Sequence, residues 1–203
     1  MNRLRILKIA WAAALVFMLL GVGVLWMLRS YGGGGYYGTV REVEAPPFTL
    51  KAHNGETVEL SDFRGKAVLM FFGFTNCPDV CPTTMRRLNE VMDLLGELRS
   101  RVRVLFITVD PERDTVERLR EYVLYYGEEF LGLTGTMEDI EHVASSYHVF
   151  FARADEDDSK SGYLMNHTSS VFLITPGGRR YLRYSQQDSE PGMIARDIRR
   201  VLN

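Results

Sequence analysis

Apolar residues recur at different intervals along the chain, and each interval predicts a different element. Two runs are almost continuously apolar, Lys66–Phe74 and Val102–Val109, which predicts strands that are covered on both faces. Between them, residues 83–95 carry apolar side chains three or four positions apart, which predicts an amphipathic helix. These three segments form a strand–helix–strand unit.

Predicted hairpins and helices flank this unit. Asn54-Gly55 lies between the apolar runs Phe48–Leu50 and Thr57–Leu60, and this pair is typical of a β-hairpin turn. A second hairpin is predicted for residues 169–184, around Pro176-Gly177. Capping patterns and apolar periodicity predict the remaining elements: helices at 114–126, 136–147 and 193–201, and a short strand at 149–152.

The order of these elements resembles the thioredoxin-like fold, an α/β arrangement with a central mixed sheet, flanking helices and here an N-terminal β-hairpin. We expect this domain to occupy residues 45–203, because Ala45-Pro46-Pro47 starts an extended segment. Residues 30–44 are rich in glycine and are predicted to be a flexible linker.

The N-terminal segment has a different character. Ile9–Leu28 carries no charged residue over about 20 positions, the length of a transmembrane helix, and Trp11 and Trp26 lie near its ends. Basic residues precede it, which places the N-terminus in the cytoplasm. We expect residues 1–29 to form a cytoplasmic tip and a single-pass anchor in the inner membrane, with the domain in the periplasm or another extracytoplasmic space. A cleaved signal peptide is the alternative, although its apolar region is usually shorter.

Charge and cysteine content narrow the choice of function. The net charge is −2, with acidic and basic residues mixed along the chain, so a nucleic-acid partner is not expected. The chain has only 2 cysteines, which excludes a dense disulfide scaffold and a site of four thiolates. Any sulfur chemistry therefore depends on Cys77 and Cys81.

Cys77 and Cys81 lie where a buried strand meets the start of a helix. The helix dipole and the free backbone N–H groups there favour thiolate over thiol. Pro82 fits best as the first helical residue, so we place Cys77 in a bent loop and Cys81 at the helix edge, with room for an ion between the sulfurs. A plain disulfide or a pair of inert buried thiols is the alternative.

His167 is the predicted third member of this site. In a thioredoxin-like fold, the residue just before the first strand of the late hairpin packs against the cysteine loop, and Asn166-His167-Thr168 occupies that place. Two thiolates and one imidazole suit copper as Cu(I) or Cu(II), whereas zinc accepts the same ligands but usually takes a fourth. Asp110 is interpreted as a turn former, and Arg113 and Asp114 as loop and helix-cap residues.

Four segments together resemble the Sco/SenC family of membrane-anchored copper-binding proteins: FTNCPDVCPTTM, TVDPERDT, LTGT and MNHTSSVFLI. The resemblance covers the chain from about Ala45 to its C-terminus. It implies a thioredoxin-like fold, one copper ion held by Cys77, Cys81 and His167, and a metallochaperone role in assembling the dinuclear copper centre of cytochrome c oxidase. The implied partners are the copper-bearing subunit of that oxidase and other copper chaperones. Many members have aspartate where this chain has Asn166.

Two other functions remain open at this point. In a thiol–disulfide oxidoreductase, Cys77 would attack a partner's disulfide and Cys81 would resolve the mixed disulfide, and the resemblance implies that the cysteines of the oxidase copper site would be the substrate. The cysteines would then be a catalytic redox pair and the protein an enzyme. A copper or redox sensor is the third interpretation, and it ranks last because we expect no signalling domain on the cytoplasmic side.

Overall fold

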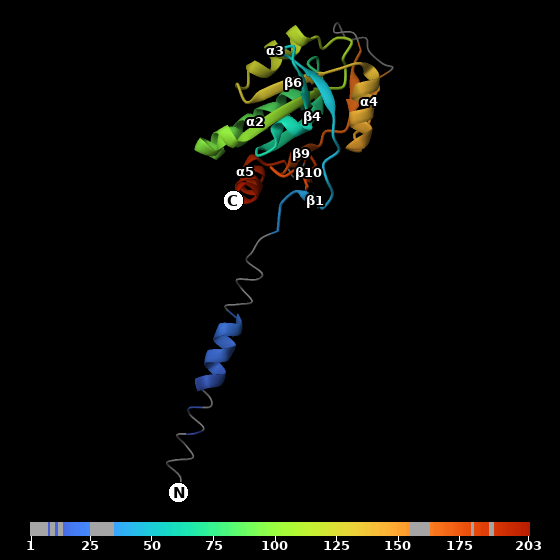
Figure 1. Cartoon of the computed structure of the whole chain (residues 1–203). Coiled ribbons are helices and arrows are strands. Elements are labelled where there is room, and N and C mark those ends of the chain that lie inside the picture. Colours follow the sequence, from blue (N-terminus) through green and yellow to red (C-terminus); the bar gives the residue numbers. More distant parts are fainter. Residues whose placement is uncertain are drawn as a thin grey trace. The chain divides into compact units, whose positions relative to one another are not determined.

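The computed structural model describes residues 8, 11, 14–24, 35–154, 163–179, 181–186 and 189–203. The chain divides into two compact units, Met1–Gly35 and Tyr36–Asn203 (Figure 1).

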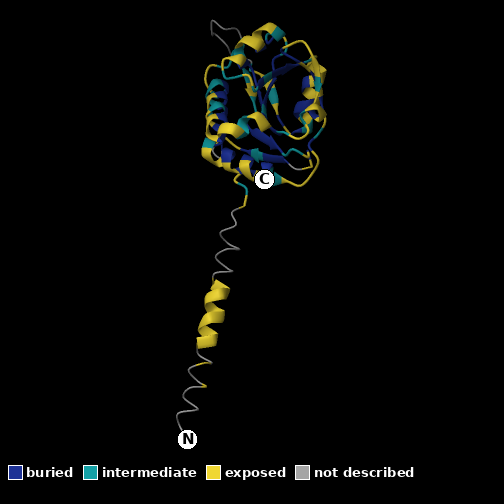
Figure 2. Cartoon of the chain, turned by 60° about the vertical axis from the view of Figure 1, so that its left-hand side comes forward, coloured by how far each residue is buried: buried dark blue, intermediate teal, exposed yellow. Residues whose placement is uncertain are grey.

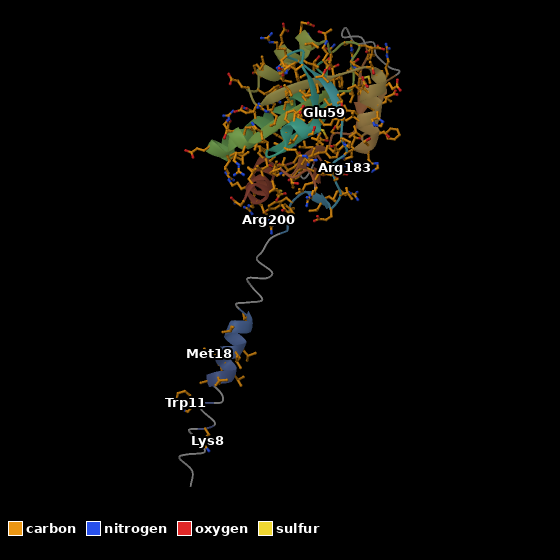
Figure 3. The ribbon with its side chains drawn as sticks, viewed as in Figure 1. Lys8, Trp11, Met18, Glu59, Arg183 and Arg200 are labelled. Atoms are coloured by element: carbon orange, nitrogen blue, oxygen red, sulfur yellow. The ribbon has the colours of Figure 1, made fainter. Side chains whose placement is uncertain are left out.

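Within the first unit, residues 14–24 are helical and all of their side chains are exposed (Figure 2). Trp11 and Met18 both project from this part of the chain (Figure 3). None of the helices formed by the described residues is both long and apolar enough to cross a membrane. The predicted span Ile9–Leu28 lies partly outside the described residues, since positions 9, 10, 12, 13 and 25–28 are not among them.

The second unit is built on an eight-stranded sheet with the strand order β1-β10-β9-β4-β5-β6-β2-β3. The strands β4, β5 and β6 are parallel to one another, and the other neighbours are antiparallel. The eight strands are β1 (Thr39–Arg41), β2 (Thr49–Ala52), β3 (Thr57–Glu59), β4 (Ala67–Gly73), β5 (Val102–Thr108), β6 (Phe130–Thr134), β9 (Val171–Ile174) and β10 (Tyr181–Tyr184). A separate two-stranded sheet pairs β7 (Phe151–Arg153) with β8 (Met165–His167).

Helices cover both faces of the large sheet (Figure 1). They are α2 (Val80–Leu95), α3 (Val116–Leu124), α4 (Met137–Ser146) and α5 (Pro191–Leu202), with short 3-10 turns at η1 (Leu60–Phe63) and η2 (Gly96–Arg101). All seven residues of β4 are buried. Phe71 packs on Phe106, which contacts Tyr122 of α3, whereas Phe72 packs on Tyr147 at the end of α4. Because neighbouring side chains of a strand point to opposite faces, α3 and α4 lie on opposite sides of the sheet.

The predicted α/β thioredoxin-like arrangement is confirmed by this topology, including the buried strands, both hairpins and the terminal helix. Strand β6 was not predicted. It has only five residues, and its central Gly132 packs so closely on α3 that an added Cβ would lie 3.0 Å from Leu119 Cβ. This packing is a tertiary contact, and an apolar pattern over only five residues is too short to predict either the contact or the strand.

Part of the predicted linker 30–44 is ordered in the described structure. Strand β1 pairs with β10, and the backbone N–H groups of Tyr37 and Gly38 donate to the buried carboxylate of Asp197, at 2.9 and 3.1 Å. The folded unit consequently begins ahead of Ala45, at about Tyr36.

Candidate metal centre

The cysteine loop joins the central strand β4 to helix α2. Its backbone turns back at Cys77, whose N–H donates to the carbonyl of Phe74 at 3.3 Å. Helix α2 begins at Val80, so Cys81 lies in its first turn and Pro82 is its third residue. The prediction that Pro82 is the first helical residue is therefore wrong by two positions. Proline is tolerated here because the first N–H groups of a helix have no partner within it.

The structure brings the two cysteines and the predicted histidine together. Cys81 Sγ lies 3.4 Å from His167 Nε2, and the backbone N–H of Cys81 donates to Cys77 Sγ at 3.3 Å. Cys81 is fully buried, whereas Cys77 is half-buried and reaches the surface. Neither thiol is in a disulfide.

His167 ends strand β8, and its ring is held on several sides. Nδ1 lies 3.3 Å from the carbonyl oxygen of Thr168, and Nε2 faces Cys81 Sγ. The ring also packs edge-on against Phe71 and Phe74, with centroids 5.9 and 6.0 Å apart. The imidazole is thus presented to sulfur with the nitrogen that can bind a metal.

The two thiols have unequal acidity. A hydrogen bond from the Cys81 thiol lowers the pKa of Cys77 to about 4, helped by His167 and by backbone N–H groups and opposed by burial. The same hydrogen bond, together with burial, raises the pKa of Cys81. The pair therefore shares one proton, with the negative charge on the more accessible sulfur.

These distances are compatible with one ion between sulfur and nitrogen. With bond lengths of about 2.3 Å to sulfur and about 2.0 Å to nitrogen, as found for zinc, the 3.4 Å separation subtends about 104° at an ion. Nonetheless, the described residues contain no group of three or more His, Cys, Asp or Glu side chains already arranged to hold a metal.

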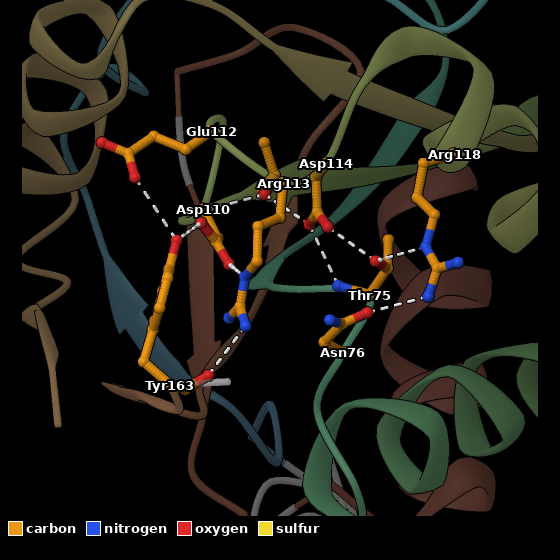
Figure 4. A network of polar contacts seen from close by, with 9 residues as sticks. Thr75, Asn76, Asp110, Glu112, Arg113, Asp114, Arg118 and Tyr163 are labelled. Carbon is orange, nitrogen blue, oxygen red and sulfur yellow. Dashed lines mark hydrogen bonds and ion pairs between the residues drawn. The ribbon is translucent and has the colours of Figure 1, made fainter. Parts of the chain in front are cut away.

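The cysteine loop is anchored to the segment that follows β5 (Figure 4). The carboxylate of Asp114 accepts from the N–H and hydroxyl of Thr75, at 3.0 and 2.6 Å, and from the hydroxyl of Thr108, at 2.6 Å. Arg118 donates to Thr75 Oγ1 at 3.1 Å and to Asn76 Oδ1 at 2.8 Å. Burial raises the pKa of Asp114. These contacts fix the two residues that precede Cys77.

The same segment also holds the chain that leads to His167 (Figure 4). Asp110 accepts from Arg113 Nε at 2.5 Å and from the Tyr163 hydroxyl at 2.7 Å, and Arg113 donates to the Tyr163 carbonyl at 2.8 Å. The Tyr163 ring lies between the guanidinium groups of Arg113 and Arg153, each 3.6 Å from its centroid. Residues 110–118 therefore connect both halves of the site.

Comparison with known proteins identifies the family and agrees with the fold. A family model described as SCO1/SenC matches residues 38–203. The chain belongs to the SCO1/SenC family. An SCO2-like protein of Rickettsia felis is 34% identical over 195 residues, which cover 88% of this chain and 90% of that protein.

Solved structures of SCO1/SenC relatives share the fold. The crystal structure of Arabidopsis thaliana ScoI with copper bound is 35% identical, has a TM-score of 0.70, and covers 78% of this chain and 99% of that one. BsSco, described as a member of the Sco family of cytochrome c oxidase assembly proteins and as carrying a disulfide switch, is 26% identical with a TM-score of 0.61. It covers 79% of this chain and 94% of that one.

Several side chains that hold the loops around Cys77, Cys81 and His167 were not identified from the sequence. The prediction that Asp114 caps the following helix is wrong, because Thr115 is the cap and accepts from Arg118 N–H at 3.2 Å. Asp114 instead binds Thr75, 39 residues earlier. Tyr163 and Arg118 are not part of any motif recognised in the sequence. Only their long-range hydrogen bonds show that they hold the loops of the site.

Proposed function

We propose that this protein is a metallochaperone that binds one copper ion through Cys77, Cys81 and His167 and delivers it to the dinuclear copper centre of cytochrome c oxidase. The contact between Cys81 Sγ and His167 Nε2, beside the Cys77 sulfur, carries the proposal. Two sulfurs and one imidazole form a soft ligand set that suits copper as Cu(I) and, with the nitrogen, as Cu(II). The copper-bound Arabidopsis relative supports copper as the metal, and the assembly role stated for BsSco supports a function in cytochrome c oxidase assembly.

Transfer would proceed by ligand exchange at the exposed side of the site. A thiolate of the receiving protein bonds to copper as a sulfur of this protein leaves, so the copper keeps its oxidation state. Cys77 is the first sulfur that an incoming group meets, because Cys81 is fully buried. The incoming thiol gives up a proton, and a departing thiolate can take one up.

Copper titration of the reduced full-length protein tests the ligand set. We expect one ion per chain and a sulfur-to-copper charge-transfer band with Cu(II). His167→Ala should weaken copper binding by at least about 100-fold, since losing only an outer partner of a ligand costs about 10–100-fold. His142→Ala, which changes an exposed histidine of α4, is the matched control. Equal affinity of the His167→Ala and parent proteins would refute the three-ligand site.

A thiol–disulfide reductase is the second candidate, and the unequal thiols favour it. An accessible thiolate at Cys77 beside a buried thiol at Cys81 is the arrangement of an attacking and a resolving cysteine. The Cys81→Ser protein should then accumulate a mixed disulfide with the cysteines of the oxidase copper site, and a copper chelator should not slow its formation. If no adduct forms with Cys81→Ser, this candidate is excluded.

We also propose that Ile9–Leu28 anchors the protein in the inner membrane with the folded unit on the extracytoplasmic side. The support is the charge-free apolar run and the basic residues ahead of it. Protease added to intact spheroplasts should remove residues 36–203 while leaving the N-terminus protected. Full protection of the folded unit would contradict this orientation.

A further inference from the structure

We propose that Phe150 and the hollow between it and His167 form the docking platform for the protein that receives the copper. The hollow would take an apolar side chain that flanks the thiolate ligands of that protein. This inference rests on the proposed function and identifies the partner surface of the same site.

Phe150 is exposed, yet its backbone is fixed. Its side chain is 85% exposed, and with Tyr125 at 84% it is the most exposed large apolar residue that the structure describes. The N–H of Phe150 donates to the Thr168 hydroxyl at 3.0 Å, and the N–H of Thr168 donates back to the Phe150 carbonyl at 2.8 Å. Phe150 is thereby held beside the residue that follows His167.

The chain just before Phe150 explains why its ring faces outward. Tyr147 closes helix α4 and is buried, with its hydroxyl donating to the Pro46 carbonyl at 2.8 Å. His148 then adopts φ of 55°, the left-handed conformation that only a few per cent of non-glycine residues have. The N–H of Val149 donates to the Ala144 carbonyl at 2.8 Å. The core on one side and the turn at His148 together set the direction of Phe150.

Two hollows flank the Phe150 side chain. The one toward the metal site has a volume of about 240 Å³ and is lined by Phe150, Phe151, Ala152, Asn166, His167 and Thr168. The other, of about 400 Å³, lies between Phe150 and helix α4 and includes Glu141 and His148. An apolar cavity of about 150 Å³ already holds benzene, so the smaller hollow has room for one apolar side chain. No lining residue of that hollow is Asp, Glu, Lys or Arg.

The transfer step itself defines what covers this surface. Ligand exchange requires a sulfur of the receiving protein to come within about 2.3 Å of an ion that His167 also binds. A polypeptide that approaches so closely must cover the residues around His167, and these are the residues that line the smaller hollow. Because the lining contains no Asp, Glu, Lys or Arg, contact there should depend on apolar complementarity and only weakly on salt.

Copper transfer to two acceptors tests the platform. The copper-loaded full-length protein is mixed either with the purified apo form of the copper-bearing domain of the oxidase subunit or with the small chelator bathocuproine disulfonate. For Phe150→Ala we expect the second-order rate constant for transfer to the protein acceptor to fall by about tenfold, as for an aromatic residue central to an interface. Transfer to the chelator, which needs no docking surface, should not change. Tyr125→Ala, an equally exposed aromatic residue outside both hollows, should transfer at the parental rate to both.

Each other result overturns the proposal. If Phe150→Ala supplies the protein acceptor as fast as the parent does, the platform is refuted while the metallochaperone function stands. If transfer to the chelator falls as much as transfer to the protein, Phe150 acts on the metal site and not on docking. A parent protein that binds copper but gives none to the oxidase domain refutes the proposed function as well.

Discussion

Replacing Gly73 with alanine probes how tightly the sheet packs against the cysteine pair. Gly73 is the last residue of β4, and a Cβ added there would lie 2.9 Å from ring carbons of both Phe71 and Phe106 and 3.0 Å from Cys81 Sγ. The favourable distance between carbon atoms is about 3.5–4.0 Å. The new methyl group would therefore be too close to all three neighbours.

The neighbours of Gly73 have little space into which they could move. Phe71, Phe106 and Cys81 are all completely buried. Extra methyl groups in a well-packed core destabilise a protein by about 1–3 kcal/mol. With a urea dependence of about 2 kcal/mol per molar, this corresponds to a decrease of about 0.5–1.5 M in the unfolding midpoint. The sulfur of Cys81 would also shift by several tenths of an ångström relative to His167.

Urea unfolding of the apo protein, followed by far-UV circular dichroism, measures the first effect, and Cu(I) competition titration measures the second. We expect Gly73→Ala to lower both the midpoint and the copper affinity. Gly177→Ala is the matched control, because nothing lies within 4 Å of its added Cβ. A midpoint and an affinity for Gly73→Ala that equal those of the parent would show that the sheet does not press on Cys81, and would refute the packing argument.

Two further predictions concern the cysteine loop. Arg118→Ala removes the hydrogen bonds to Thr75 and Asn76 and should weaken copper binding by about 10–100-fold, with a smaller effect on stability. Arg120→Ala, on the same helix, is the control and should leave the copper affinity unchanged. If Arg118→Ala lowers stability as much as it lowers copper affinity, the contacts of Arg118 are only structural. Alkylation of the reduced apo protein by iodoacetamide should occur at Cys77 first. Since the pKa of Cys77 is about 4, its thiolate is fully formed above about pH 6, and the alkylation rate should stay constant from there to about pH 8. An ordinary thiol of pKa about 8.5 would instead react about tenfold faster for each pH unit over this range. A rate that rises tenfold per unit over this range would contradict the lowered pKa.

The sequence indicates those features that are encoded locally. Continuous apolar runs predicted β4 and β5, and turn residues predicted both hairpins, because period and turn chemistry are properties of neighbouring residues. The position of His167 opposite the cysteines was predicted from the order of the elements. These expectations needed no knowledge of contacts between distant parts of the chain.

Long-range contacts account for what the sequence did not indicate. Asp114 and Thr115 both have the chemistry of a helix cap, and local pattern alone cannot show that Thr115 takes that role while Asp114 turns inward to Thr75. Strand β6 is recognisable only once Gly132 is seen against α3. Tyr163 and Arg118 are ordinary polar residues until the fold brings them to the loops that they hold.

The imidazole and the two sulfurs belong to parts of the molecule with different resistance to local opening. Strand β8 pairs only with β7, over three residues, and this ribbon forms no ladder with the large sheet in the described part of the chain. Small units of this kind open more readily than buried central strands such as β4, so their amide protons should exchange sooner. An opening of the ribbon would withdraw nitrogen and leave both sulfurs in place. In the proposed site, the imidazole would therefore be the ligand most exposed to local opening, and the two sulfurs the ligands held by the more stable part of the fold.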